Sequence, residues 1–216
     1  MKKIIYEGPR PLREIRAVYN ENSIRVYQAF SAAIAIPAIE NQTFVSPFKF
    51  ELSWASWIKP SFLWTLTRTQ WGKFTRIGKK QEKGEHEDDT FVLGVDVKRD
   101  FFDKILSIGQ LTHYPEGFDK IEWKKLMQKA KVYVQWDPEK SINGRGRSWK
   151  AIQIGLKTKV LKEYAESIVR IEDMSNLIET IKHEKYTDDK IKLLPNEIPY
   201  PVPEEIEKHI KMYQKN

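Results

Sequence analysis

The order of apolar and polar positions along the chain predicts short strands and helices in alternation. Residues 14–19 and 24–30 alternate at a period of two on either side of the turn-forming segment 20–23, which is typical of a β-hairpin. An apolar, alanine-rich run over 32–40 then predicts a short helix. The N-terminal part therefore begins with strand, turn, strand and helix.

The next stretch is aromatic and contains a helix start marked by a proline. Segment 57–59 is expected to be extended because it precedes Pro60, which itself suits a first helical turn. The apolar spacing over 62–71 predicts a helix that Gly72 ends. Residues 73–89 are first basic and then acidic, and they predict a long mobile loop.

The second half of the chain continues this mixture of elements. Buried-strand patterns predict strands at 90–96, 131–136, 149–156 and 167–171, and Asp137-Pro138 is expected to stop the second of them. Apolar spacing and capping residues predict helices at 98–108, 120–130, 158–166 and 173–183. Because the elements mix without a strict β–α–β rhythm, the expected fold class is α+β.

Length and composition restrict the class of protein further. The 216 residues favour a single domain, with an entering arm at 1–13, a core at 14–203 and a C-terminal helix within 204–216. A hydrophobic content of 40% with seven Trp excludes a disordered chain. The absence of Cys excludes a disulfide scaffold, a thiolate metal site and a Cys nucleophile. With no apolar run of membrane-spanning length and no export signal, we expect a cytoplasmic protein without a membrane partner.

The net charge of +7 favours an anionic partner, either nucleic acid or a nucleotide cofactor. The alternative is that Lys and Glu simply alternate on solvated helix faces. The segment 73–89 supplies the candidate nucleic-acid contacts, which are Lys73, Arg76, Lys79, Lys80 and Lys83. The four His are scattered without ligand spacing, so no metal is expected.

A candidate anion site lies where the extended segment 57–59 meets the following helix. The first N–H groups of a helix lack internal partners and its dipole is positive there, so Lys59 and Ser61 would complete a site for phosphate or pyrophosphate. The alternative is that Ser61 only helps the helix to start and that the stem of Lys59 lies over Trp57.

The strand predicted at 24–30 carries two further candidates. Arg25 and Tyr27 share one side of their strand, where Arg binds phosphate or ribose and Tyr stacks on a ring. The alternative for Arg25 is an edge-strand position that faces water.

Polar residues at the ends of two later strands suit the mouth of a pocket. Gln135, Asp137 and Glu139 follow one strand, although an Asp before Pro is more commonly a turn former. Arg147 and Gln153 flank the strand that contains Trp149. Gln153 lies in an apolar run, so its amide requires either a structural hydrogen bond or a ligand.

Four sequence blocks, at 24–29, 57–64, 134–139 and 151–156, resemble a family known only as a domain of unknown function (family 4291). The resemblance runs from about residue 14 to residue 203. The block Trp-Ile-Lys-Pro-Ser-Phe at 57–62 is its most specific part. The family name itself implies no activity.

The order of elements is similar, more distantly, to the ADP-ribosyltransferase superfamily. That resemblance implies a split, mostly antiparallel pair of small sheets that hold NAD. Strand 24–30 with its helix, the segment 57–71 and strand 91–96 correspond to successive elements of that fold. A late strand carries a Glu or Gln there, and Gln153 or Gln135 would take its place.

By this resemblance the protein would use NAD as substrate, release nicotinamide through a ribosyl cation and transfer ADP-ribose. The basic charge balance then favours nucleic acid, such as RNA, as the acceptor. Gln153, with Asp137 and Glu139 as other candidates, would be catalytic. The expected NAD-binding residues are Arg25, Tyr27, Lys59, Ser61 and Arg147. A Gln where the superfamily has a Glu is a departure from its pattern.

Two other functions remain open from the sequence. One is a basic module that binds single-stranded nucleic acid without catalysis. The other is an interaction domain with a vestigial pocket. The enzyme hypothesis predicts that Arg25, Lys59 and Gln153 converge on one cationic hollow sized for a dinucleotide, and three side chains on separate faces would exclude it.

Overall fold

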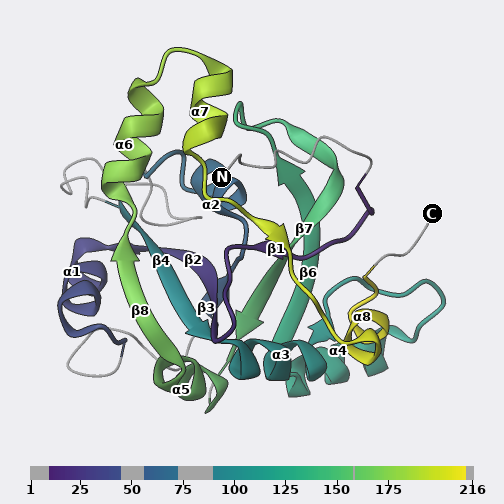
Figure 1. The fold of residues 1–216 in the computed structure, drawn as a ribbon. Helices are drawn as coiled ribbons and strands as arrows, with labels where there is room; N and C mark the ends of the chain where they lie inside the picture. Colours follow the sequence, from purple (N-terminus) through teal and green to yellow (C-terminus); the bar gives the residue numbers. More distant parts are fainter. Residues whose placement is uncertain (1–9, 45–55, 73–89, 158, 213–216) are drawn as a thin grey trace, which may run out of the picture.

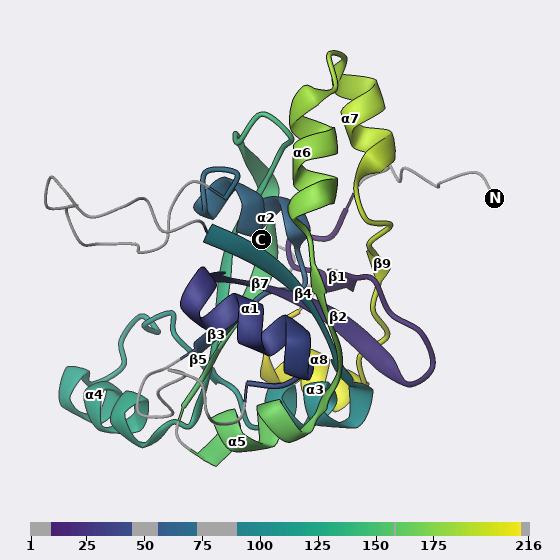
Figure 2. The same ribbon diagram turned by 90° about the vertical axis from the view of Figure 1, so that its left-hand side faces the viewer.

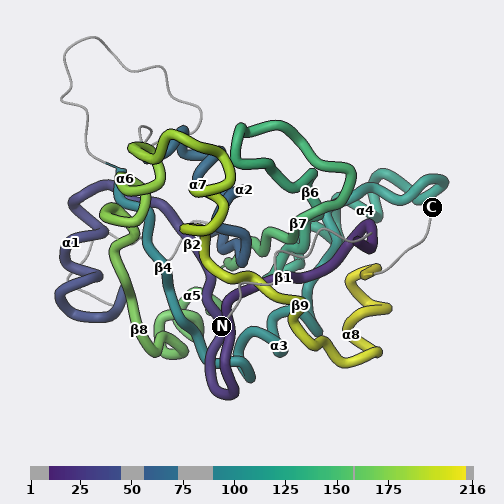
Figure 3. The backbone as a smooth tube through the Cα atoms, turned by 45° about the horizontal axis from the view of Figure 1, so that its top comes forward, coloured from purple at the N-terminus to yellow at the C-terminus, as the bar shows by residue number. Residues whose placement is uncertain are grey.

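Two β-sheets, one of three strands and one of four, form the centre of the molecule (Figure 1). This computed structural model describes residues 10–44, 56–72, 90–157 and 159–212. A third, two-stranded sheet joins β1 (Arg16–Ala17) to β9 (Ile198–Pro199). Figure 3 shows how this pairing brings the start and the end of the described chain side by side.

The three-stranded sheet has the order β2 (Ser23–Ser31), β4 (Thr90–Lys98) and β8 (Ile168–Asp173), with all neighbours antiparallel. The central strand β4 is a nearly continuous apolar run, and it is buried along most of its length. Its register against β2 sets Arg25 opposite Asp96 and Tyr27 opposite Gly94.

The four-stranded sheet has the order β3 (Ser56–Ile58), β7 (Gly146–Leu156), β6 (Val132–Lys140) and β5 (Gln110–Leu111). Its pairs are antiparallel except β5 with β6. Side chains of β6 and β7 alternate, so that Val134 and Ile154 enter the core while Gln135 and Gln153 are only partly buried. One face of this sheet is therefore open to a ligand.

Helices cover the sheets and both of their ends. The short helix α2 (Phe62–Arg68) contacts both β2 and β6, and it thus bridges the two sheets. Figure 2 shows α1 against the three-stranded sheet and the α6–α7 hairpin rising from one end. The other helices are α1 (Ala32–Asn41), α3 (Arg99–Ser107), α4 (Lys120–Lys129), α5 (Lys159–Glu166), α6 (Ser175–His183), α7 (Thr187–Leu193) and α8 (Glu204–His209).

The core has two clusters of apolar side chains. The larger lies between the sheets and includes Val26, Val95 and Ile154, together with the aromatic rings of Phe102 and Tyr164. The smaller packs α2 and α6 on β2, and its members include Tyr27, Phe62, Leu66, Met174 and Ile178. Within the described residues, no helix combines the length and apolar character that crossing a membrane requires.

The α+β class and the mostly antiparallel pairing are confirmed, and most predicted elements are present. The predicted hairpin is only partly correct, because β1 pairs with β9, while the residues after β1 join β2 through the Tyr19–Ile24 bridge and a hydrogen bond from the Arg25 N–H to the Val18 carbonyl. Asp137-Pro138 does not stop β6. The missing N–H of Pro138 is tolerated there because the neighbouring β5 pairs only with Tyr133 and Val134, at the other end of β6.

Two other differences concern short elements. The pattern did not predict β5, β9 and α7, which have two to seven residues and little apolar periodicity. The C-terminal helix is shorter than expected, because α8 ends at His209. The predicted loop at 73–89 lies outside the described residues.

Candidate functional site

A cleft of about 770 Å³ lies on the open face of the four-stranded sheet, beside α2. This volume is in the range of small-molecule and cofactor sites. Strands β3, β6 and β7 supply one wall and α2 with the residues after it supplies the other. The lining residues are Trp57, Lys59, Trp64, Thr67, Arg68, Gln70, Gln135, Asp137, Pro138, Lys140 and Gln153.

The junction between the two sheets fixes the backbone of Lys59. Its carbonyl oxygen accepts from the Tyr27 N–H at 2.7 Å, and its own N–H donates to the Tyr27 carbonyl at 3.3 Å. Pro60 follows at once, and Ser61 caps α2 by accepting from the Trp64 N–H at 3.2 Å. The strand, the bridge and the cap therefore direct the Lys59 side chain toward the first turn of α2.

Asp137 is held between two amides at the floor of the cleft. Gln135 Nε2 donates to Asp137 Oδ1 at 2.8 Å, and Gln153 Nε2 donates to Oδ2 at 2.6 Å. The two glutamines are direct cross-strand partners, so β6 and β7 present them together. This arrangement fixes the carboxylate while each amide oxygen still offers acceptor capacity to a ligand.

Lys59 is the titratable group that the cleft perturbs most clearly. Its pKa is lowered to about 8, mainly because burial disfavours the charged form and also because Arg68 adds a like charge, while Asp137 acts in the opposite direction. Its Nζ lies 4.8 Å from the centre of the Trp64 ring. A significant fraction of neutral amine is therefore present near pH 8.

Aromatic rings continue the open face of the sheet beyond the cleft. Trp57 lies nearly parallel to Tyr133, with ring centres 6.2 Å apart and planes inclined by 22°. Lys157 Nζ lies 4.3 Å over the Tyr133 ring. Gly155 is the register partner of both rings, and its missing side chain leaves the space that Trp57 occupies.

Gly155→Ala is expected to displace the Trp57 ring, because a Cβ at this position would lie 3.0–3.1 Å from three of its ring atoms. Overpacking of this kind costs about 1–2 kcal/mol of unfolding free energy. Urea denaturation and near-UV circular dichroism measure the two effects. Gly146→Ala on the same strand is the control, because its Cβ would have 3.7 Å to the nearest atom. An unchanged aromatic spectrum for Gly155→Ala would contradict the prediction.

A smaller hollow of about 200 Å³ adjoins the cleft and shares Trp57, Lys59 and Arg68 with it. Gln28 lines this hollow, and two contacts fix its amide. Its Nε2 donates to Ser56 Oγ at 2.7 Å, and its Oε1 accepts from the Tyr164 hydroxyl at 2.6 Å. The cleft therefore has a rigid polar side chamber next to Lys59.

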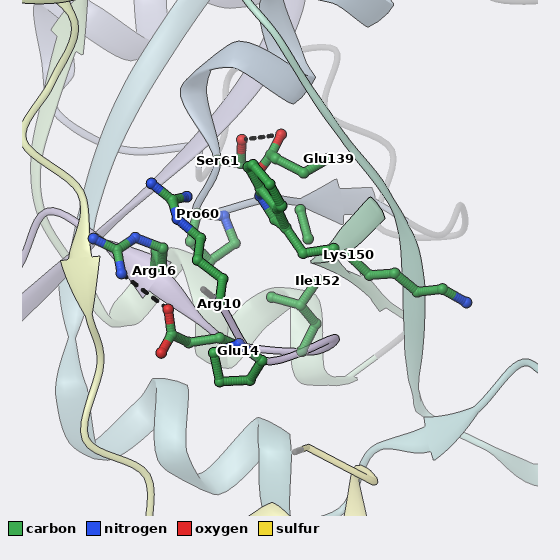
Figure 4. A pocket seen from close by; sticks show the side chains of 11 residues that line it. Arg10, Glu14, Arg16, Pro60, Ser61, Glu139, Lys150 and Ile152 are labelled. Carbon is green, nitrogen blue, oxygen red and sulfur yellow. Dashed lines mark hydrogen bonds and ion pairs between the residues drawn. The ribbon is translucent and has the colours of Figure 1, made fainter. Parts of the chain in front are cut away.

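Ser61 and Glu139 lie behind the cleft rather than in it, around a cavity with room for about one water molecule (Figure 4). Ser61 Oγ donates to Glu139 Oε1 at 3.0 Å. The neighbouring Phe62 N–H donates to Glu197 Oε1 at 2.7 Å. The residues of this cavity thus fix the start of α2, and α2 carries Trp64 and Arg68 into the cleft.

Burial raises the pKa of both carboxyls at the start of α2, Glu139 and Glu197, and the like charge of Glu139 raises the pKa of Glu197 further. A carboxyl with a raised pKa binds more protons in the folded state, so its contribution to stability falls as the pH rises through that pKa. Glu197→Gln is therefore expected to melt at a higher temperature than the wild type at neutral pH, and this advantage should vanish on acidification toward about pH 4.

Calorimetry across this pH range tests the effect. Glu204→Gln is the control, because Glu204 is exposed on α8 and its ion pair with Lys208 contributes little. A lower melting temperature for Glu197→Gln at neutral pH would mean that the carboxylate is ionised and stabilising.

Arg25 and Tyr27 do not reach the cleft. The Arg25 guanidinium binds both oxygens of Asp96 at 2.8 Å, and its Nη1 lies 2.8 Å from Glu172. These hydrogen bonds raise the pKa of Arg25 further above its ordinary value. Tyr27 is fully buried against Phe62, with ring centres 5.1 Å apart. The expected convergence therefore holds for Lys59 and Gln153 but does not include Arg25.

Arg147 also lies apart from the cleft, on the exposed start of β7. Its guanidinium lies 5.4 Å from the centre of the Trp149 ring, and Arg10 approaches the same ring at 4.9 Å. The basic residues expected to bind nucleic acid, 73–83, are outside the described residues. Among the residues that are described, no group of three or more His, Cys, Asp or Glu could hold a metal ion.

The sequence patterns missed the contribution of α2. Trp64, Thr67 and Arg68 line the cleft, and they stand at positions i, i+3 and i+4 of one helix. That spacing puts them on a common face, which is the signal that could have identified them. Lys140 was also missed, because β6 was expected to end before it.

Most of the chain, including the whole cleft, matches one protein-family model. A family model described as Domain of unknown function (DUF4291) matches residues 14–200. The chain belongs to this family. The match covers every residue of the cleft, and it confirms the resemblance carried by the four sequence blocks. No curated protein matches this DUF4291 chain.

Proposed function

We propose that this DUF4291 protein is an ADP-ribosyltransferase-like enzyme that binds NAD in the cleft beside α2. The observation that carries the proposal is the combination, in one cleft of about 770 Å³, of aromatic walls, cations and one fixed carboxylate. A dinucleotide requires each of these. Its rings stack on aromatic side chains, and its pyrophosphate binds cations.

The cations of the cleft support a role in holding the pyrophosphate. Arg68 and Lys140 line the cleft together with Lys59, and among the described residues Asp137 is the one acid in its lining. Arg68 projects from the last turn of α2 and offers the planar fork that suits phosphate. Trp57 and Trp64 offer ring faces for adenine or nicotinamide.

Asp137 supports the chemical step. In this reaction the bond between ribose C1′ and the nicotinamide nitrogen breaks, and its electron pair neutralises the pyridinium ring. The acceptor then bonds to C1′ and releases its proton to solvent. Asp137 would stabilise the positive charge that develops on the ribose, because Gln135 and Gln153 hold it in place before the reaction.

Gln153 acquires a role in this scheme although it carries no charge. It stands where the distant resemblance implies a Glu, and its amide lies 2.6 Å from a carboxylate oxygen of Asp137. The pair therefore offers an amide for the ribose hydroxyls and a negative charge for the cation. The net charge of +7 favours a nucleic acid, such as RNA, as the acceptor.

Two measurements test the proposal. Calorimetric titration with NAD is expected to give binding, and radiolabelled NAD is expected to transfer its label to RNA, DNA or protein with release of nicotinamide. Asp137→Asn should retain NAD binding but lose about 100-fold in turnover, since one preorganised charge is removed. Lys150→Gln is a matched control, because the Lys150 side chain points away from the cavity behind the cleft (Figure 4).

Absence of NAD binding would refute the proposal that the protein is an NAD-dependent enzyme. If the protein instead binds a single-stranded oligonucleotide with steep salt dependence and ignores NAD, the non-catalytic module is the better description.

A further inference from the structure

We propose that the cleft captures small phosphorylated aldehydes covalently, as an imine on the Lys59 amine. This proposal does not require that NAD be the substrate. It rests on the surroundings of Lys59, on the charge around it and on the space beside it.

The Lys59 amine is positioned but not neutralised by an ion pair. Its backbone is held on both sides by the Tyr27 bridge, and its Nζ lies 4.8 Å over the Trp64 ring. Among the described residues, no carboxylate oxygen forms a salt bridge with it, and Asp137, the acid of the cleft, is held by its two glutamines. An amine in such a place is available to an electrophile.

The charged groups that face Lys59 come from two elements. Arg68 reaches it from α2, whereas Asp137 and Lys140 reach the cleft from β6. Arg68 disfavours a second positive charge nearby, so it increases the share of neutral amine and also offers a guanidinium to a phosphate. One residue thus activates the amine and holds the anionic end of the ligand.

The space beside Lys59 suits a small ligand. The side chamber of about 200 Å³ is lined by Lys59 itself and shares Arg68 and Trp57 with the main cleft. An aldehyde group in this chamber would meet Nζ while its phosphate met Arg68. The fixed amide of Gln28 offers polar contacts at the far side of the chamber.

The reaction balances without a further reagent. The neutral amine adds to the carbonyl carbon and gives a carbinolamine. In this addition one amine hydrogen moves to the carbonyl oxygen, which becomes the hydroxyl. The hydroxyl then leaves together with the second amine hydrogen as water, and a carbon–nitrogen double bond remains. No electron donor or acceptor is needed, and hydrolysis reverses the reaction.

Pyridoxal 5′-phosphate and pyridoxal are the probes, each followed by borohydride reduction and peptide mapping by mass spectrometry. Lys59 is expected to be labelled by the phosphorylated probe ahead of exposed lysines such as Lys125 on α4. Its labelling rate should rise with pH and level off above about pH 8. Arg68→Gln should reduce labelling by the phosphorylated probe roughly tenfold more than labelling by pyridoxal, because only the phosphorylated probe loses a charge-assisted contact, while both lose the smaller effect of Arg68 on the charge of the amine.

The outcomes separate this proposal from the proposed function. Equal labelling of Lys59 and Lys125 would overturn it, as would equal labelling of Lys59 by the two probes. Lys59→Arg must remove the label from its peptide. NAD binding without selective labelling would leave the enzyme proposal standing and refute the imine, and selective labelling without NAD binding would do the reverse.

Discussion

Lys59→Met is expected to weaken NAD binding about 100-fold and, at the same time, to raise the melting temperature of the free protein. The loss follows because the ammonium is the most enclosed cation of the cleft, and one charge-assisted contact to phosphate accounts for about 100-fold in Kd. The gain follows because the charged amine is held in a site that disfavours its charge, and methionine removes this penalty.

The pH dependence of the gain has a definite sign. Since the folded-state pKa of Lys59 is lowered to about 8, the charged form penalises folding at all lower pH values. The penalty fades as the pH rises from that value toward the ordinary lysine pKa. Thermal denaturation of the two proteins should therefore show its largest difference at neutral pH and a smaller one at about pH 9.5.

The matched control is Lys125→Met, which removes an exposed cation on α4 and should alter neither property. If Lys59→Met binds NAD with an unchanged Kd, the amine is not part of the nucleotide site.

Arg25→Met is expected to lower the unfolding free energy by about 3 kcal/mol and to leave NAD affinity unchanged. The guanidinium is largely buried, and its loss removes the ion-pair partner of the Asp96 carboxylate and leaves Glu172 with the solvent-exposed Arg170. Urea denaturation measures the first effect, and calorimetric titration measures the second.

Two further variants sharpen this test. Arg170→Met removes a solvent-exposed partner of Glu172 at 3.6 Å, and it should cost less than about 1 kcal/mol. Arg25→Met combined with Asp96→Leu should recover part of the lost stability, because the second substitution removes the carboxylate that Arg25→Met leaves without its partner. A large loss of NAD affinity in folded Arg25→Met would show that Arg25 takes part in NAD binding, contrary to this prediction.

The regular parts of the fold could be predicted because their apolar periods are local. Strand β2 alternates and β4 runs apolar over most of nine residues, the second half of β7 is apolar except for Gln153, and α3 shows helical spacing. The strand β5 and the helix α7 could not be predicted, because they are short and packing against their neighbours stabilises them more than their own pattern does.

The candidate site was predictable only in part, and Arg25 shows why. Alternation along β2 identified the side on which the guanidinium lies. What faces it there depends on the register of β2 against β4, which sets Asp96 opposite from 71 residues further along the chain. Lys59 and Gln153 could be found because each is a polar residue in an apolar setting, where such groups require a partner. Asp137 was a candidate because polar residues were expected at the end of its strand, at the mouth of a pocket.

The contact between Glu197 and the first N–H of α2 makes the cleft depend on residues close to the C-terminal end of the described chain. Proteolytic trimming before residue 195 would remove this carboxyl together with β9, the partner of β1. None of the cleft's own side chains would be cut away. Shortened versions would nonetheless bind ligands poorly, so the minimal functional fragment is expected to extend at least through Tyr200, which closes over Asp103 and Arg99.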